Sequence, residues 1–121
     1  MTKLIFHITV DEAWQAAVKQ GRYEPESLSQ EGFIHCSVLS QILGVANAFY
    51  RGQSGLILLA IDPERLTCEL KWEPPAEPQP GHATAGELFP HLYGPLNLEA
   101  VVKSVSFKPD ANGLFSALPD L

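Results

Sequence analysis

The amino-acid sequence predicts an α+β fold in which two early helices pack on a mixed or antiparallel sheet. Up to residue 61 the chain alternates strand-like and helix-like segments, and beyond it strand-like segments dominate. No glycine-rich phosphate-binding fingerprint occurs in the sequence, which argues against a doubly wound parallel sheet and against a P-loop fold. The length of 121 residues suits a single compact domain over 1–121, large enough to form a core without disulfides or metal.

The first half of the chain is expected to alternate between strands and helices. Thr9 and Glu12 have the spacing of a capping box, which predicts that a helix begins at Thr9, and Gly21 supplies its stop. Ser37 or Ser40 is placed to cap the second helix. The expected elements are a strand over 3–8, a helix to about residue 20, a loop over 22–31, a strand over 33–36 and a helix that ends at Gly52.

The second half is expected to be mostly extended. The apolar run over 55–61 is typical of a strand that is buried on both faces. Residues 66–72 alternate apolar and polar side chains, which predicts a half-buried strand with Trp72 on its inner face. Prolines interrupt the segment 73–86, so we expect a surface loop there. The remaining elements are extended chain over 88–98, a strand over 100–107 and a weakly ordered tail over 109–121 in which Leu114, Phe115 and Leu118 can dock.

Charge and composition restrict the partners of the protein. The formal net charge is −6, and the eight lysines and arginines are scattered without a cluster. Because phosphate neutralisation supplies most of the affinity for nucleic acids, long nucleic acids are poor candidates, whereas a small nucleotide remains possible. The sequence contains no apolar run long enough for a membrane span and no leader pattern. We therefore expect a cytoplasmic protein with reduced thiols, either a monomer or a weak homodimer.

Three histidine-bearing stretches predict one polar pocket. The central stretch, 32–37, reads as a short strand that carries His35 and Ser37 to the start of a helix. Strand-to-helix junctions collect polar side chains and free backbone N–H groups. The stretches 5–9 and 89–94 carry His7 and His91, and we expect them to meet the first. Each histidine can bind a sugar or phosphate oxygen, but it can also be a core histidine bonded to a backbone carbonyl, which for His7 alone is the better interpretation.

The other candidate residues also have two interpretations. Ser37 can cap a helix and contact a ligand at the same time, whereas Cys36 alternates away from it and should pack in the core. Glu73 can stabilise a developing oxocarbenium ion or accept a sugar hydroxyl proton, but it can equally be a solvated loop acid. Tyr93 alternates onto the face of His91 or belongs only to a turn, and Tyr23 can face the pocket.

A metal site is a rival use of the same side chains. His7, His35, His91 and Glu73 would suit zinc or iron if they converged. The sequence shows no local ligand spacing, such as two histidines four residues apart on one helix, so no metal is expected.

Motifs over nearly the whole chain resemble the bacterial family known as domain of unknown function 952. The resemblance rests on Ile5–Thr9, Gly21–Tyr23, Ser27–Leu28, Glu31–Ser37, Gln41, Ala46–Asn47, Phe49–Tyr50 and Phe89–Gly94. That family is in turn similar to the ADP-ribosyltransferase fold, in particular to RNA 2′-phosphotransferases. In those enzymes a first strand carries His-Gly-Thr and a second strand carries His-x-Ser before a helix. This chain has Ile8 where the first motif has glycine.

The resemblance implies a pocket for NAD or a ribosyl phosphate. By this similarity His7, Thr9, His35 and Ser37 would bind NAD as a substrate, with Tyr23, His91 and Tyr93 beside them. His35 and Glu73 are the implied catalytic residues, and Glu73 takes the place of the late acidic residue of the transferases.

The predicted function is cleavage or transfer at the N-glycosidic carbon of NAD or a related ribonucleotide. Two alternatives remain open from the sequence. One is a non-catalytic module that binds a nucleotide or another small metabolite, and the other is a metal-dependent enzyme that uses the clustered histidines.

Overall fold

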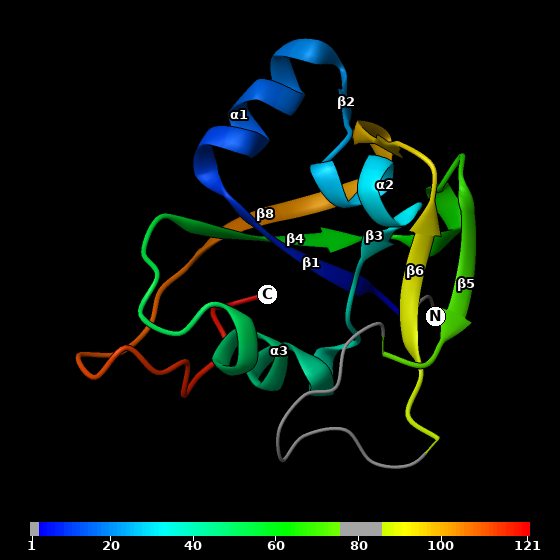
Figure 1. Cartoon of the computed structure of the whole chain (residues 1–121). Coiled ribbons are helices and arrows are strands. Elements are labelled where there is room, and N and C mark those ends of the chain that lie inside the picture. Colours follow the sequence, from blue (N-terminus) through cyan, green and yellow to red (C-terminus); the bar gives the residue numbers. More distant parts are fainter. Residues whose placement is uncertain (1–2, 76–85) are drawn as a thin grey trace.

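The computed structural model describes residues 3–75 and 86–121 and confirms an α+β architecture with antiparallel sheets (Figure 1). In this part of the chain the helices are α1 (Asp11–Gln20), α2 (Glu26–Glu31) and α3 (Ile42–Phe49). The strands are β1 (Ile5–Val10), β2 (Arg22–Tyr23), β3 (Ile34–His35), β4 (Leu56–Ile61), β5 (Glu69–Glu73), β6 (Phe89–Tyr93), β7 (Leu96–Asn97) and β8 (Val101–Phe107). Short 3₁₀ helices occupy Leu39–Gln41, Pro63–Arg65 and Leu98–Ala100.

The first sheet has the order β1–β4–β8 and is covered on both faces. Ile5 and Leu59 face one core, to which α1 contributes, and Phe6 and Leu58 face a second core that contains α3 and the C-terminal tail (Figure 1). Every residue of β4 except the half-buried Ile57 is buried, which confirms the prediction for this run. Full burial of one such aliphatic side chain stabilises the fold by about 1.5–3 kcal/mol.

The second sheet has the order β3–β6–β5 and, among the described residues, joins the first at one isolated backbone bridge. The Phe6 N–H donates to the Ser37 carbonyl at 2.7 Å, and the Ser37 N–H donates to the Phe6 carbonyl at 2.8 Å. In β3 and β6, His35 lies opposite His91. The bridge and this register bring all three histidine-bearing stretches together, as the sequence predicted.

The predicted capping box at Thr9 is wrong. β1 continues through Thr9 to Val10, which pairs with Leu56 of β4, and Val10 is the N-cap of α1 without a side-chain cap. Pairing with β4 therefore keeps Thr9 in the strand, and its hydroxyl contacts Tyr23 and does not cap the helix. The helix stop is confirmed, because Gly21 adopts the left-handed conformation with φ of 95°.

Two further predictions for the first half are corrected by the structure. The segment 22–31 is not a loop, since it contains β2 and the six-residue helix α2. Neither Ser37 nor Ser40 caps the second helix: Val38 precedes the 3₁₀ turn that leads into α3. The backbone of Ser37 is held instead by the bridge to β1.

The strand predicted over 66–72 begins later and ends later than expected. β5 starts at Glu69, and its last residue is Glu73, which therefore lies in a strand and not in the proline-rich loop. Trp72 is 48% exposed, contrary to the predicted inner position, because it sits on the edge strand of the second sheet. Most of the predicted loop, 76–85, lies outside the described residues.

The C-terminal tail, for which the sequence predicted weak order, contacts α3 and β8 through Phe115. Phe115 is 2% exposed and its ring packs on Phe107 with a centroid separation of 4.7 Å. Asn47 on α3 clamps the same residue, because its amide nitrogen donates to the Phe115 carbonyl at 2.9 Å and its amide oxygen accepts from the Phe115 N–H at 2.8 Å. The predicted docking of Phe115 is thereby confirmed.

We expect Asn47→Ala to lower the free energy of unfolding by about 1–3 kcal/mol, because it leaves two part-buried backbone groups of Phe115 without partners. Urea denaturation followed by circular dichroism measures the change. Asn112→Ala is the matched control, since this side chain is exposed and makes no hydrogen bond within the described residues. Equal stability of the two variants would contradict the clamp.

Candidate functional site

A pocket of about 730 Å³ lies where the two sheets meet. Its size is in the usual range for a small-molecule site. Its lining includes six of the polar residues that the sequence singled out: His7, Thr9, Tyr23, His35, Ser37 and His91. The other two predicted residues do not line it. Tyr93 lines a separate, smaller pocket, and Glu73 reaches this one only through its contact with His91.

His7 is held through both of its ring nitrogens. Nδ1 lies 2.6 Å from the carbonyl oxygen of His35, which can only accept, so Nδ1 carries the proton and donates. Nε2 lies 2.8 Å from the Tyr23 hydroxyl, and that hydroxyl lies 2.9 Å from the hydroxyl of Thr9. In a neutral ring Nε2 must accept, so the Tyr23 hydroxyl donates to it and accepts a hydrogen bond from the Thr9 hydroxyl in turn.

Burial keeps this chain of hydrogen bonds uncharged. Desolvation lowers the pKa of His7 to about 4, and it raises the pKa of Tyr23 to about 12. At neutral pH both groups are therefore neutral, and His7 has no ring nitrogen left for proton transfer. The structure supports the core interpretation of His7, bonded to a backbone carbonyl, although the ring also forms part of the pocket wall.

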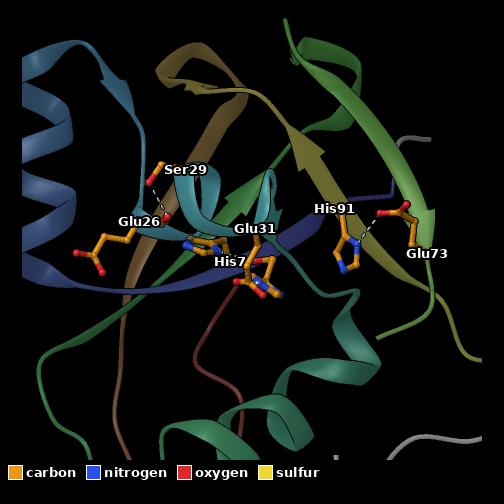
Figure 2. Close-up of polar contacts among 7 residues, drawn as sticks. His7, Glu26, Ser29, Glu31, Glu73 and His91 are labelled. Carbon is orange, nitrogen blue, oxygen red and sulfur yellow. Dashed lines mark hydrogen bonds and ion pairs between the residues drawn. The ribbon is translucent and has the colours of Figure 1, made fainter. Parts of the chain in front are cut away.

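Among the described residues, His91 is hydrogen-bonded through one ring nitrogen only. Its Nδ1 donates to Oε1 of Glu73 at 2.8 Å (Figure 2). The hydroxyl of Tyr93 donates to the same oxygen at 2.5 Å. These two bonds lower the pKa of Glu73, so the carboxylate stays ionised, and the bond to Glu73 raises the pKa of Tyr93. The His91 ring stacks on Phe33 with a centroid separation of 4.2 Å. In the described part of the chain, Nε2 of His91 has no hydrogen-bond partner.

His35 lies at the rim of the pocket. Its Nε2 is 2.8 Å from Oε2 of Glu31, and the side chains of His35 and Glu31 are 42% and 40% exposed. The ring meets that of His91 edge to face at a centroid separation of 5.7 Å. Because α2 was not predicted, the sequence interpretation missed Glu31, although its spacing of four residues from His35 was the available signal.

Ser37 supplies a hydroxyl without a partner. The residue is 6% exposed and lines the pocket, its backbone is fixed by the bridge to Phe6, and its hydroxyl makes no hydrogen bond to any described residue. A buried hydroxyl without a partner costs free energy unless water or a ligand satisfies it. Ser37 therefore points to a bound polar group in this pocket.

The remaining candidates have simple placements. Cys36 packs in the core with Ile34, and burial raises the pKa of its thiol, which agrees with the prediction that it is no nucleophile. Ile8 is buried in the core that contains Ile42. Within 3–75 and 86–121, no group of three His, Cys, Asp or Glu side chains is arranged to hold a metal ion. Nor does any helix in these segments have the length and apolar character needed to cross a bilayer.

Comparison with known proteins identifies relatives but no activity. The family model described as "Protein of unknown function (DUF952)" matches residues 8–104. The crystal structure of protein CC0527 from Caulobacter crescentus is similar, with 38% sequence identity over 92% of this chain and 91% of that chain, and a TM-score of 0.78. The solution NMR structure of CC0527 is similar with 38% identity over 93% and 90% of the two chains, and a TM-score of 0.72. No curated protein matches this chain.

We predict that the buried His7 makes the fold sensitive to acid. Its folded pKa of about 4 lies below the ordinary value of 6.5, so between these values the unfolded chain binds a proton that the folded chain does not. The free energy of unfolding should therefore fall as the pH drops from 6.5 to 4, by about 3 kcal/mol from this group.

His7→Asn tests this assignment, because the amide can still donate to the His35 carbonyl but does not titrate in this range. Urea denaturation at several pH values should show a shallower pH dependence for the variant than for the wild type. Parallel curves for the two proteins would show that His7 is not the group responsible.

Proposed function

Since this chain belongs to the DUF952 family of proteins of unknown function, we propose its activity from its own pocket: an enzyme that cleaves or transfers at the N-glycosidic carbon of NAD or a related ribonucleotide. The observation that carries the proposal is the buried hydroxyl of Ser37, which lacks a protein partner among the described residues and lies in one pocket with His91. Ribose hydroxyls are suitable partners for such groups, since each can both donate and accept a hydrogen bond.

His91 is the proposed general base. Glu73 fixes the proton on Nδ1 and leaves the lone pair of Nε2 free to accept another, the arrangement that orients catalytic histidines in general. The N-glycosidic bond breaks with its electron pair going to the nitrogen of the leaving base. The oxygen of water or of an acceptor hydroxyl then bonds to the sugar carbon, and its proton passes to Nε2 of His91.

This geometry changes the proposed role of Glu73. Its carboxylate bonds the outer edge of His91 and does not line the pocket, so we assign it a positioning role in place of a direct contact with the sugar. Tyr93 in turn holds Glu73. Glu26 and Glu31 are the carboxylates that line the pocket among the described residues. Glu31 is paired with His35, and we propose that this pair stabilises the positive charge that develops on the sugar.

The proposal rests on the strand arrangement around the pocket and not on the resemblance to ADP-ribosyltransferases. Two antiparallel sheets meet at one bridge, with His7 on a strand of the first sheet and the stretch from His35 to Ser37 at the edge of the second. The rival function is a non-catalytic binding module. His7 favours this alternative, because both of its ring nitrogens are hydrogen-bonded within the protein, so the residue can position a ligand but cannot move a proton.

Two substitutions separate binding from catalysis. We expect Ser37→Ala to weaken NAD binding about tenfold, the value of roughly one hydrogen bond, as measured by isothermal titration calorimetry. We expect His91→Gln to retain binding but to lower the rate of nicotinamide release by about 10²–10⁴-fold, because the proton acceptor is lost.

Ser104→Ala is the matched control for Ser37→Ala, since Ser104 lies exposed on β8 and its hydroxyl makes no hydrogen bond within the described residues. Binding of NAD with no product in the wild type would favour the binding module. A folded wild-type protein that binds neither NAD nor a related riboside would overturn the proposal.

A further inference from the structure

Among the described residues, the pocket lining contains two carboxylates and no lysine or arginine. Among the described lining residues, Glu26 and Glu31 are the charged side chains other than histidine, and they come from the two ends of α2 (Figure 2). No lysine or arginine belongs to this lining. A ligand that enters the pocket therefore meets two carboxylates at its rim.

The rest of the chain supplies little positive charge to offset these two carboxylates. The segments 1–2 and 76–85, which the structure does not describe, contain no lysine or arginine in their sequence. The first turn of α2 lines the pocket, but it carries Glu26 itself. Arg22 pairs with Glu24, and Lys71 lies over the ring of Tyr93, which is outside the pocket lining.

A phosphate group is therefore poorly matched to this pocket. Proteins bind phosphates with Arg, Lys or convergent backbone N–H groups, and like charges placed opposite one another oppose binding. The acidic rim alone would not define a site. The buried hydroxyl of Ser37, which has no partner among the described residues, is the independent observation that points to a ligand.

The other walls suit a cationic aromatic ring attached to a sugar. Tyr23, Tyr50 and Phe89 line the pocket with aromatic surface, and a ring cation is attracted both to such faces and to nearby carboxylates. The hydroxyl groups and His91 lie in the same lining and suit the sugar.

We infer that the substrate class of this pocket is a phosphate-free N-riboside whose base carries a positive charge, as in a pyridinium riboside. The inference rests on the proposed function: it keeps the cleavage at the N-glycosidic carbon and replaces the nucleotide substrate by the corresponding nucleoside. When the glycosidic bond breaks, its electron pair neutralises the ring nitrogen and the positive charge passes to the sugar. Water adds to that carbon, and its proton goes to His91. The carboxylates of Glu26 and Glu31 stabilise the positive charge both on the ring nitrogen of the substrate and on the sugar.

Calorimetric titration with nicotinamide riboside, its 5′-phosphate and NAD tests the inference. We expect the riboside to bind about tenfold more tightly than its 5′-phosphate at low salt, and the difference to shrink as salt screens the rim. The double substitution Glu26→Gln with Glu31→Gln should weaken the riboside and strengthen the phosphate, so that the two affinities approach one another.

Glu12→Gln is the control, because Glu12 is an exposed acid on α1 outside the pocket lining. A 5′-phosphate or NAD that binds as tightly as the riboside, or more tightly, would overturn this inference while leaving the proposed activity standing. If none of the three compounds binds to the folded protein, both the inference and the proposed activity fail.

Discussion

The backbone bridge between Phe6 and Ser37 is the constraint on which the site depends. Its two hydrogen bonds, of 2.7 and 2.8 Å, connect the sheet of β1, β4 and β8 to the sheet of β3, β6 and β5. Because the bridge belongs to the backbone, it leaves the Ser37 side chain available to the pocket. It also sets the position of β3, which carries His35 opposite His91.

His7 and His91 differ in how many of their ring nitrogens are hydrogen-bonded within the protein. The two nitrogens of His7 are both taken, and burial lowers its pKa to about 4, so it acts as a neutral support for Tyr23 and Thr9. His91 is bonded only through Nδ1 within the described residues, and an ionised carboxylate fixes that tautomer. Of these two histidines, only His91 keeps a ring nitrogen without a partner among the described residues, and residue type alone would not have distinguished it from His7.

Much of the fold and of the site was readable from the sequence because it depends on strong local patterns. The apolar run of β4 and the alternation around His7 and His35 predicted buried strands and a shared pocket correctly. The capping box at Thr9 failed because pairing between β1 and β4 overrode a local preference. The pairing of Glu73 with His91 and the clamp of Asn47 on the tail join residues 18 and 68 positions apart, so no local pattern signals them.

The most direct test of the account is an NMR measurement of the histidine ring nitrogens during titration with nicotinamide riboside. The account predicts that both His7 and His91 carry their proton on Nδ1 in the free protein, and that the ligand moves the Nε2 resonance of His91. The His7 resonances should keep the pattern of a neutral ring throughout. If the ligand binds and leaves the His91 ring unchanged, the assignment of His91 to the reaction is contradicted.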